Sequence, residues 1–151
     1  MEKRNLGNTG TKVGALGIGA MSFSDFYGPT NTQESHAILK MALDNGIDHI
    51  DTAKVYGMGL SEERIGQFLN TLSPNDRQFF KIATKGGIDR KNFDDKGTVV
   101  FDNSKEFLTE ELNNSLKRLG VDCVELYYVH RREADRSIEE VTDCLLYTSD
   151  A

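Results

Sequence analysis

Features that mark several classes of protein are missing from this chain of 151 residues. It has only two cysteines, Cys123 and Cys144, too few for a disulfide-rich secreted scaffold and spaced for neither a metal site nor a redox pair. Its apolar runs are far shorter than the roughly 20 residues of a membrane-spanning helix, and its first residues lead into no apolar signal core. We therefore expect a reduced, cytoplasmic protein with no metal site and no membrane segment.

The chain also lacks a strong excess of either charge. It has 24 acidic and 18 basic residues, a net charge of −6, and the two signs are interspersed. This mild acidic excess gives no reason to expect a nucleic acid or an acidic lipid as a partner. The 38% of hydrophobic and 28% of charged residues are typical of a soluble globular chain, and the length suits one domain.

Short apolar segments alternate along the chain with amphipathic segments that begin at helix-capping residues. A cluster of turn residues at 7–10 predicts a hairpin over residues 1–15. Strands are predicted over residues 16–21, 47–52, 79–84 and 123–129. Helices are predicted to begin near Thr30 or Asn31, at Ser61, at Ser104, and at Ser137, where Glu140 completes a capping box. Residues 86–103 are predicted to be a long polar loop.

Local signals add detail to two of these helices. The first is expected to end near Asn45, with Gly46 as its stop. Its expected apolar face comprises Ala37, Ile38, Met41 and Ala42. The second is expected to open at Ser61, and Glu62 lies in its first turn, where a carboxylate suits the helix dipole.

The alternation of strands and helices predicts βαβ units and a parallel sheet. Two architectures remain open from the pattern alone: an open doubly wound sheet, and half of an eightfold barrel that normally needs about 250 residues. Residues 17–22 begin like the glycine-rich fingerprint of a dinucleotide-binding fold, but Ser22 replaces the third glycine. No helix is predicted there to receive a pyrophosphate, which argues against that fold.

Four polar residues lie where predicted strands end. Asp51 ends the second strand and Tyr56 follows it, Lys85 follows the third, and His130 follows the fourth. The carboxyl ends of parallel strands share one face of an α/β fold, and that face carries the active site. A parallel sheet would therefore bring these four side chains together. Each of them alone has an ordinary structural explanation, and only their joint placement favours catalysis.

The chemistry of the four groups is complementary. A phenol, with an ordinary pKa of about 10, is a poor proton donor near neutrality, and a neighbouring ammonium favours its ionised form. A carboxylate would hold the ammonium in place, and a neutral imidazole would orient a carbonyl oxygen. Together they would polarise an aldehyde or ketone and protonate the alkoxide as a hydride arrives. None of them supplies the hydride, so a nicotinamide cofactor is implied.

Residues 51–57 read Asp-Thr-Ala-Lys-Val-Tyr-Gly, which resembles the D-T-A-x-x-Y-G signature of the aldo-keto reductases. The match extends in order from about Arg4 to Asp143. It includes the hairpin and first strand at residues 6–21 and the third-strand lysine motif at residues 82–85. It also includes the stretch before the fourth strand at residues 115–120 and the fourth-strand histidine motif at residues 127–131.

This resemblance implies an α/β fold, the (β/α)8 TIM barrel, of which the chain would carry the first half only: the N-terminal hairpin and about four βα units. It implies NADPH-dependent reduction of a small carbonyl compound, with Tyr56 as proton donor. The implied catalytic residues are Asp51, Tyr56, Lys85 and His130. The residues implied to lie at the cofactor are Gly19, Ala20, Met21 and Asp51.

Residues 1–143 are expected to form this half barrel. The last eight residues, 144–151, do not resemble the family, and we expect them to be a non-native tail because they are similar to a translated sequencing adapter. Two alternative functions stay open. One is a regulatory subunit that senses cofactor with the same barrel, and the other is an inactive fragment.

Overall fold

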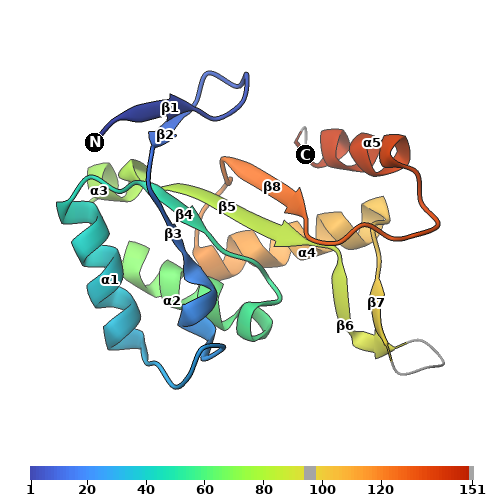
Figure 1. Ribbon diagram of the computed structural model, residues 1–151, viewed down its shortest axis with the longest axis horizontal. Coiled ribbons are helices and arrows are strands. Elements are labelled where there is room, and N and C mark those ends of the chain that lie inside the picture. Colours follow the sequence, from blue (N-terminus) through green and yellow to red (C-terminus); the bar gives the residue numbers. More distant parts are fainter. Residues whose placement is uncertain (94–97, 150–151) are drawn as a thin grey trace.

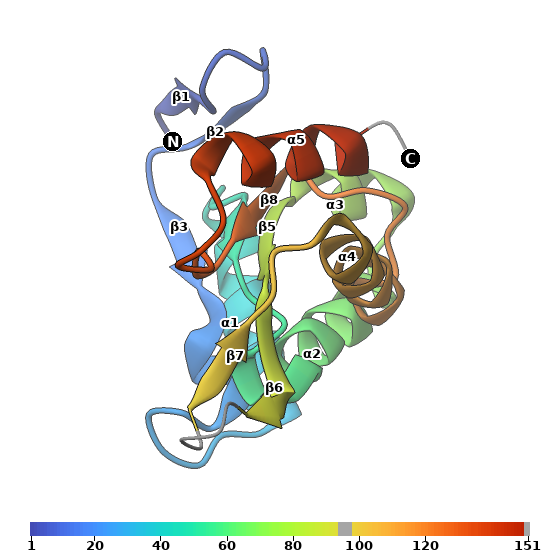
Figure 2. The same cartoon turned by 90° about the vertical axis from the view of Figure 1, so that its right-hand side faces the viewer.

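The computed structural model describes residues 1–93 and 98–149. A four-stranded parallel sheet carries helices on one face, a small hairpin lies at one end, and a second hairpin projects from the other end (Figure 1). In the view turned by 90°, the two hairpins again lie at opposite ends of the molecule (Figure 2). Within the described ranges, every helix is too short or too polar to cross a lipid bilayer.

The elements have the following bounds. The first hairpin pairs β1 (Lys3–Asn5) with β2 (Lys12–Gly14). The central sheet consists of β3 (Gly17–Gly19), β4 (His49–Asp51), β5 (Lys81–Gly86) and β8 (Leu126–Val129). The projecting arm pairs β6 (Ile88–Phe93) with β7 (Val99–Phe101). The α-helices are α1 (Thr32–Asp44), α2 (Leu60–Leu69), α3 (Pro74–Phe79), α4 (Lys105–Leu119) and α5 (Ile138–Ser149). Two short 3-10 segments are η1 (Ala20–Ser24) and η2 (Tyr56–Gly59).

The strand order of the central sheet is β3-β4-β5-β8, which is also the order of these strands along the chain, and every neighbouring pair is parallel. A doubly wound sheet reverses its order at a switch point, and this sheet does not. The order therefore favours the barrel of the two architectures that the sequence pattern left open. A single 3-10 turn, η1, and not an α-helix, follows the glycines of β3.

The structure differs from the sequence prediction in one loop and one helix. The expected polar loop over residues 86–103 is largely the β6–β7 arm, and its residues 94–97 lie outside the described residues. The helix α3 was not predicted, although Ser73 caps it and Pro74 occupies its first turn, which are both sequence signals of a helix start. Residues 144–149 of the expected tail continue α5, and residues 150–151 lie outside the described residues.

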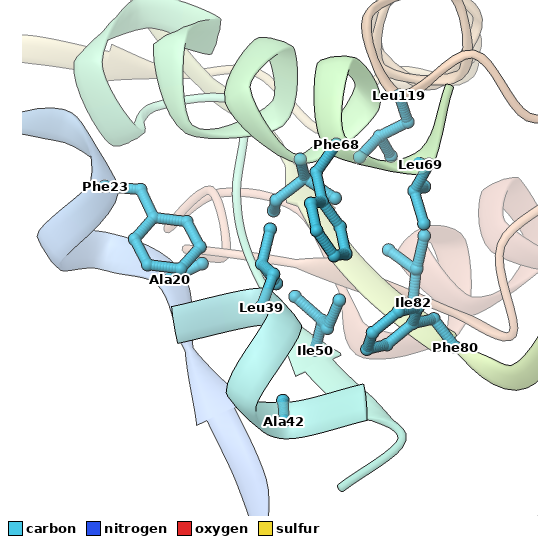
Figure 3. Close-up of a cluster of buried hydrophobic side chains, with 11 residues drawn as sticks. Ala20, Phe23, Leu39, Ala42, Ile50, Phe68, Leu69, Phe80, Ile82 and Leu119 are labelled. Carbon is cyan, nitrogen blue, oxygen red and sulfur yellow. The ribbon is translucent and has the colours of Figure 1, made fainter. Parts of the chain in front are cut away.

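The core lies between the sheet and helices α1 and α2. Ile50 and Ile82 extend from neighbouring strands toward Phe68 of α2, as Figure 3 shows. Each large apolar side chain buried in this layer contributes roughly 1.5–3 kcal/mol of transfer free energy. On α1 the buried positions are Ser35, Leu39 and Ala42, so only Ala42 of the expected apolar face is correct. Ile38 and Met41 are 46% and 67% exposed.

Successive residues of a strand face opposite sides of the sheet. Ile50 and Ile82 therefore contact the helices, whereas Asp51 and Lys85, at odd offsets from them, face the other side. This alternation gives the sheet an apolar face under the helices and a face with polar groups at the carboxyl ends of its strands. The candidate site lies on the second face.

The N-terminal hairpin is held to the sheet through Asp48, whose side chain is almost fully buried. Its carboxylate accepts a hydrogen bond from the Gly14 main-chain nitrogen at 2.6 Å and forms an ion pair with Lys3. Burial alone would raise the pKa of this carboxyl, but the hydrogen bonds from Lys3 and Gly14 and the charge of Lys3 outweigh it. The pKa of Asp48 therefore lies below its ordinary value of 3.8.

This shift predicts a pH-dependent contribution of Asp48 to stability. Because the folded-state pKa is depressed, the contribution is complete above pH 3.8 and is lost as the pH falls through the folded-state value. Asp48→Asn should lower the urea midpoint of unfolding at about pH 7, and the difference from the parent should shrink toward about pH 2. A difference that is the same at both pH values would contradict the assignment.

Candidate active site

The four polar residues predicted to meet at the strand ends do lie together. The Lys85 ammonium forms an ion pair with Asp51 and donates to the Thr52 carbonyl oxygen at 2.9 Å. It also donates to the Tyr56 hydroxyl oxygen at 3.4 Å. The Tyr56 and His130 rings meet edge to face, with centroids 5.8 Å apart and an angle of 88° between their planes. Lys85 therefore links a carboxylate to a phenol that contacts an imidazole.

The backbone explains why these side chains converge. Residues continue to pair beyond the ends of the strands: Thr52 N donates to Ala83 O at 2.9 Å, and Lys54 N donates to Lys85 O at 3.2 Å. On the other side of β5, His130 N donates to Gly86 O at 2.8 Å. Segments from β4 and β8 are thus anchored on either side of the end of β5.

The turn after Tyr56 requires glycine. Gly57 has a φ of 62°, in the left-handed region that favours glycine. A Cβ atom placed on it would lie 2.8 Å from the Cβ of Ser24 and 2.9 Å from that of Leu60. The backbone conformation and the space around it therefore both exclude a side chain, which gives a physical reason for the Tyr-Gly pair in the sequence motif.

The environment of His130 keeps its imidazole neutral. Burial lowers the pKa of His130 below its ordinary value of 6.5, and the charges of Lys85 and Arg131 lower it further. Asp51 opposes this shift but does not reverse it. The Nδ1 atom of His130 is buried and has no hydrogen-bond partner among the residues that the structure describes. A neutral ring can donate one hydrogen bond and accept another.

An open cavity of about 560 Å³ lies over Tyr56 and His130. Its wall is formed by the β6–β7 arm, by the turn after Tyr56 and by η1 with the residues that follow it. The lining residues are Met21, Ser24, Phe26, Val55, Tyr56, Gly57, Met58, Ile88, Arg90, Val99, Phe101, His130 and Arg131. The phenol and the imidazole are thus accessible to a small molecule that enters from this side.

The residues expected to lie at the cofactor differ in their exposure and in the direction of their side chains. Gly19 pairs with Asp51 in the sheet, and a Cβ atom placed on Gly19 would meet nothing within 4 Å. The open space above Gly19 is compatible with a flat ring beside Asp51. The Met21 side chain lines the cavity. Ala20 is fully buried, and its carbonyl oxygen accepts a hydrogen bond from Ser61, so its side chain faces the core.

Two buried ion pairs that were not predicted from the sequence connect α4 to the segment after β4 and to α2. Lys54 pairs with Glu111 of α4 at 2.8 Å, and both side chains are almost fully buried. The fully buried Glu62 of α2 accepts from Arg118 of α4 at 2.7 Å and from Thr84 at 2.6 Å. A charged residue at a core-facing position of an amphipathic helix is the signal that could have revealed Glu111.

The expected role of Ser61 is also wrong. The helix α2 begins at Leu60, and Gly59 precedes it without a side-chain cap. The Ser61 hydroxyl donates instead to the Ala20 carbonyl at 2.8 Å and lies 2.9 Å from the Thr52 hydroxyl. It therefore joins η1, α2 and the end of β4.

The structure closely matches solved reductases. An aldo-keto reductase from Bacillus halodurans, AKR11C1 in its holo form, superposes with a TM-score of 0.82 and 31% identity. The match covers 99% of this chain and 47% of that one. Together with the sequential parallel sheet, this confirms the predicted first half of a (β/α)8 barrel.

Comparison of amino-acid sequences also finds relatives of this kind. The NADP(+) aldo-keto reductase yakc of Schizosaccharomyces pombe is 34% identical over 142 residues, which are 94% of this chain and 40% of that protein. A probable voltage-gated potassium channel subunit beta of Arabidopsis thaliana is 34% identical over 150 residues, 99% of this chain and 43% of that protein. The chain thus spans less than half the length of these relatives. The model of the aldo/keto reductase family matches residues 15–149. The chain therefore belongs to the aldo/keto reductase family.

Proposed function

We propose that the complete protein carrying this chain reduces aldehydes or ketones to alcohols with NADPH in the cytoplasm, and that Tyr56 donates the proton. One observation carries the proposal: the Lys85 ammonium contacts both Asp51 and the Tyr56 hydroxyl, and His130 lies against Tyr56 at the same open cavity. Membership of the family and the name of the yeast relative, which includes NADP(+), support NADPH as the cofactor.

Each side chain has a distinct role in this reaction. The neutral His130 imidazole hydrogen-bonds the carbonyl oxygen and orients it toward Tyr56. The Tyr56 hydroxyl donates its proton to the oxygen as negative charge develops there. Lys85 stabilises the resulting phenolate, and Asp51 holds the ammonium in place. The nicotinamide supplies the hydride when it is bound, and Gly19, Met21 and Asp51 would lie beside it.

The direct test is NADPH oxidation, followed by absorbance, with a panel of aldehydes and ketones of increasing size. The complete protein should oxidise NADPH only when a carbonyl compound is present and should form the corresponding alcohol. A parallel series with NADH measures the cofactor preference. Absence of alcohol formation across the panel, from protein that binds NADPH, would refute the proposal.

The surroundings of His130 allow a separate test by NMR titration of its imidazole protons. The pKa should lie below 6.5 in the parent protein, because burial and the two nearby cations disfavour the charged ring. Arg131→Met removes one of those cations and should raise the pKa of His130. Asp51→Asn removes the opposing anion and should lower it further. Shifts of the same sign in both variants would contradict this electrostatic assignment.

A second function has one specific observation in its favour, the likeness to a probable potassium channel subunit beta. A regulatory subunit of that kind would bind cofactor and a partner protein without needing rapid turnover. The two functions differ in the panel assay, since a purely regulatory subunit would bind NADPH tightly but give no appreciable steady-state reduction.

A further inference from the structure

The wall of the active-site cavity combines apolar side chains with positive charge. Phe26, Met58 and Phe101 lie on it and are 62%, 49% and 37% exposed. Large apolar groups exposed in this way around a cavity are typical of a binding surface. Two arginines, Arg90 and Arg131, also line the cavity, and among the described residues that form the wall there is no aspartate or glutamate. This is notable in a chain whose net charge is −6.

The β6–β7 arm determines where Arg90 points. Side chains two residues apart share one face of a strand, and both Arg90 and Ile88 line the cavity. Asp89, between them, is buried on the opposite face. Ile88 is paired with Phe101 of β7, which also lines the cavity. The guanidinium of Arg90 therefore belongs to the same surface as these apolar side chains.

Arg131 is held next to the imidazole by its main chain. Its carbonyl oxygen accepts a hydrogen bond at 3.1 Å from Asn103, which is fully buried, and Asn103 in turn accepts from Glu133 N at 2.7 Å. The nearby Glu133 carboxylate forms an ion pair with Arg136. Among residues 1–93 and 98–149, neither Arg90 nor Arg131 forms an ion pair with a carboxylate, so both guanidinium groups can bind an anion.

We propose that the cavity takes carbonyl compounds that combine an apolar body with a carboxylate or another anionic group, which Arg90 and Arg131 bind. This inference rests on the proposed reductase function and specifies its substrate class. An arginine guanidinium binds a carboxylate through two parallel hydrogen bonds, and the apolar wall accommodates the rest of the molecule. The uncompensated positive charge also attracts an anionic substrate to a protein that is acidic overall.

The test compares two substrates of nearly equal shape, 4-carboxybenzaldehyde and its methyl ester, in the complete protein. The measured quantity is the ratio of their kcat/KM values, in which general effects on catalysis cancel. The acid should be preferred by about tenfold or more, since a hydrogen bond to a charged group contributes about a factor of 10–100. The preference should decrease as salt is added, because ions screen exposed charges.

Variants then assign the preference to the two arginines. The double variant Arg90→Met/Arg131→Met should bring the ratio close to one. Lysine at both positions should retain only part of it, because lysine keeps the charge but cannot form the two parallel hydrogen bonds. Arg132→Met is the matched control: it removes the same charge from the next residue, which does not line the cavity, and should leave the ratio unchanged.

Three outcomes would overturn the inference. Equal kcat/KM values for acid and ester would refute it and leave the reductase function intact. A rise in the KM for NADPH in the arginine variants, with the ratio unchanged, would assign the two cations to the phosphates of the cofactor. No reduction of either substrate by protein that binds NADPH would refute the reductase function and this inference with it.

Discussion

Tyr56→Phe is expected to lower kcat for aldehyde reduction by about 10²- to 10⁴-fold, the usual contribution of a positioned general acid. The substitution removes only the hydroxyl that lies 3.4 Å from the Lys85 ammonium. The ring that packs edge to face against His130 is retained. The alkoxide would then have to take its proton from water, while the surface that holds the cofactor keeps its shape.

Steady-state reduction of an uncharged aldehyde measures kcat, and NADPH fluorescence measures cofactor binding. The dissociation constant for NADPH should remain close to that of the parent. Thr9→Val provides the control, because it removes a hydroxyl that donates to the Leu6 carbonyl in the exposed N-terminal hairpin, away from the cavity, and it should leave kcat nearly unchanged. Equal losses of kcat and of NADPH affinity in Tyr56→Phe would show that this residue is not the proton donor.

Arg118→Met should lower the free energy of unfolding by about 3–5 kcal/mol, because breaking a buried ion pair leaves one charge without its partner. The charge left behind would be Glu62, which is fully buried between α2 and α4. The Arg118 side chain also packs on Gly59, where an added Cβ would lie 2.7 Å from the Arg118 Cδ. Loss of Arg118 is therefore also expected to loosen the turn that carries Tyr56.

Urea denaturation of the complete protein measures this free energy. Lys40→Met is the matched control, since Lys40 forms an exposed ion pair with Asp44 and should contribute less than about 1 kcal/mol. Adding Glu62→Gln to Arg118→Met should recover part of the loss, because no charge then remains buried. If Arg118→Met and Lys40→Met were equally mild, the Arg118–Glu62 pair would have no special structural role.

The caps of α1, α4 and α5 were predictable because the interactions that define them are local. The Asn31 side chain accepts from Glu34 N, and Glu34 reaches back to Asn31 N, as the capping pattern predicts. Ser104 begins α4 and Gly120, with a φ of 65°, ends it. These contacts join residues no more than a few positions apart, so a short stretch of sequence contains both partners.

The convergence of the four site residues was also predictable, for a different reason. Each lies at or just beyond the carboxyl end of a strand, and these ends of parallel strands meet at one edge whatever the details of the core. Their placement required only the strand positions and a parallel order. The contact between Lys85 and both Asp51 and Tyr56 then follows from neighbouring strands.

The amino-acid sequence by itself thus determined the caps of α1, α4 and α5 and the place where Asp51, Tyr56, Lys85 and His130 gather. The strand order, which distinguishes a barrel from a doubly wound sheet, came from the structure. Only the tertiary structure decided which polar groups are buried and what they contact. Ser61 resembles a helix cap but bonds to a carbonyl 41 positions away, and Glu62 resembles a residue for the helix dipole but pairs with an arginine 56 positions away. Burial of a polar group is stable only with its partner, and these partners come from distant elements that only folding brings together.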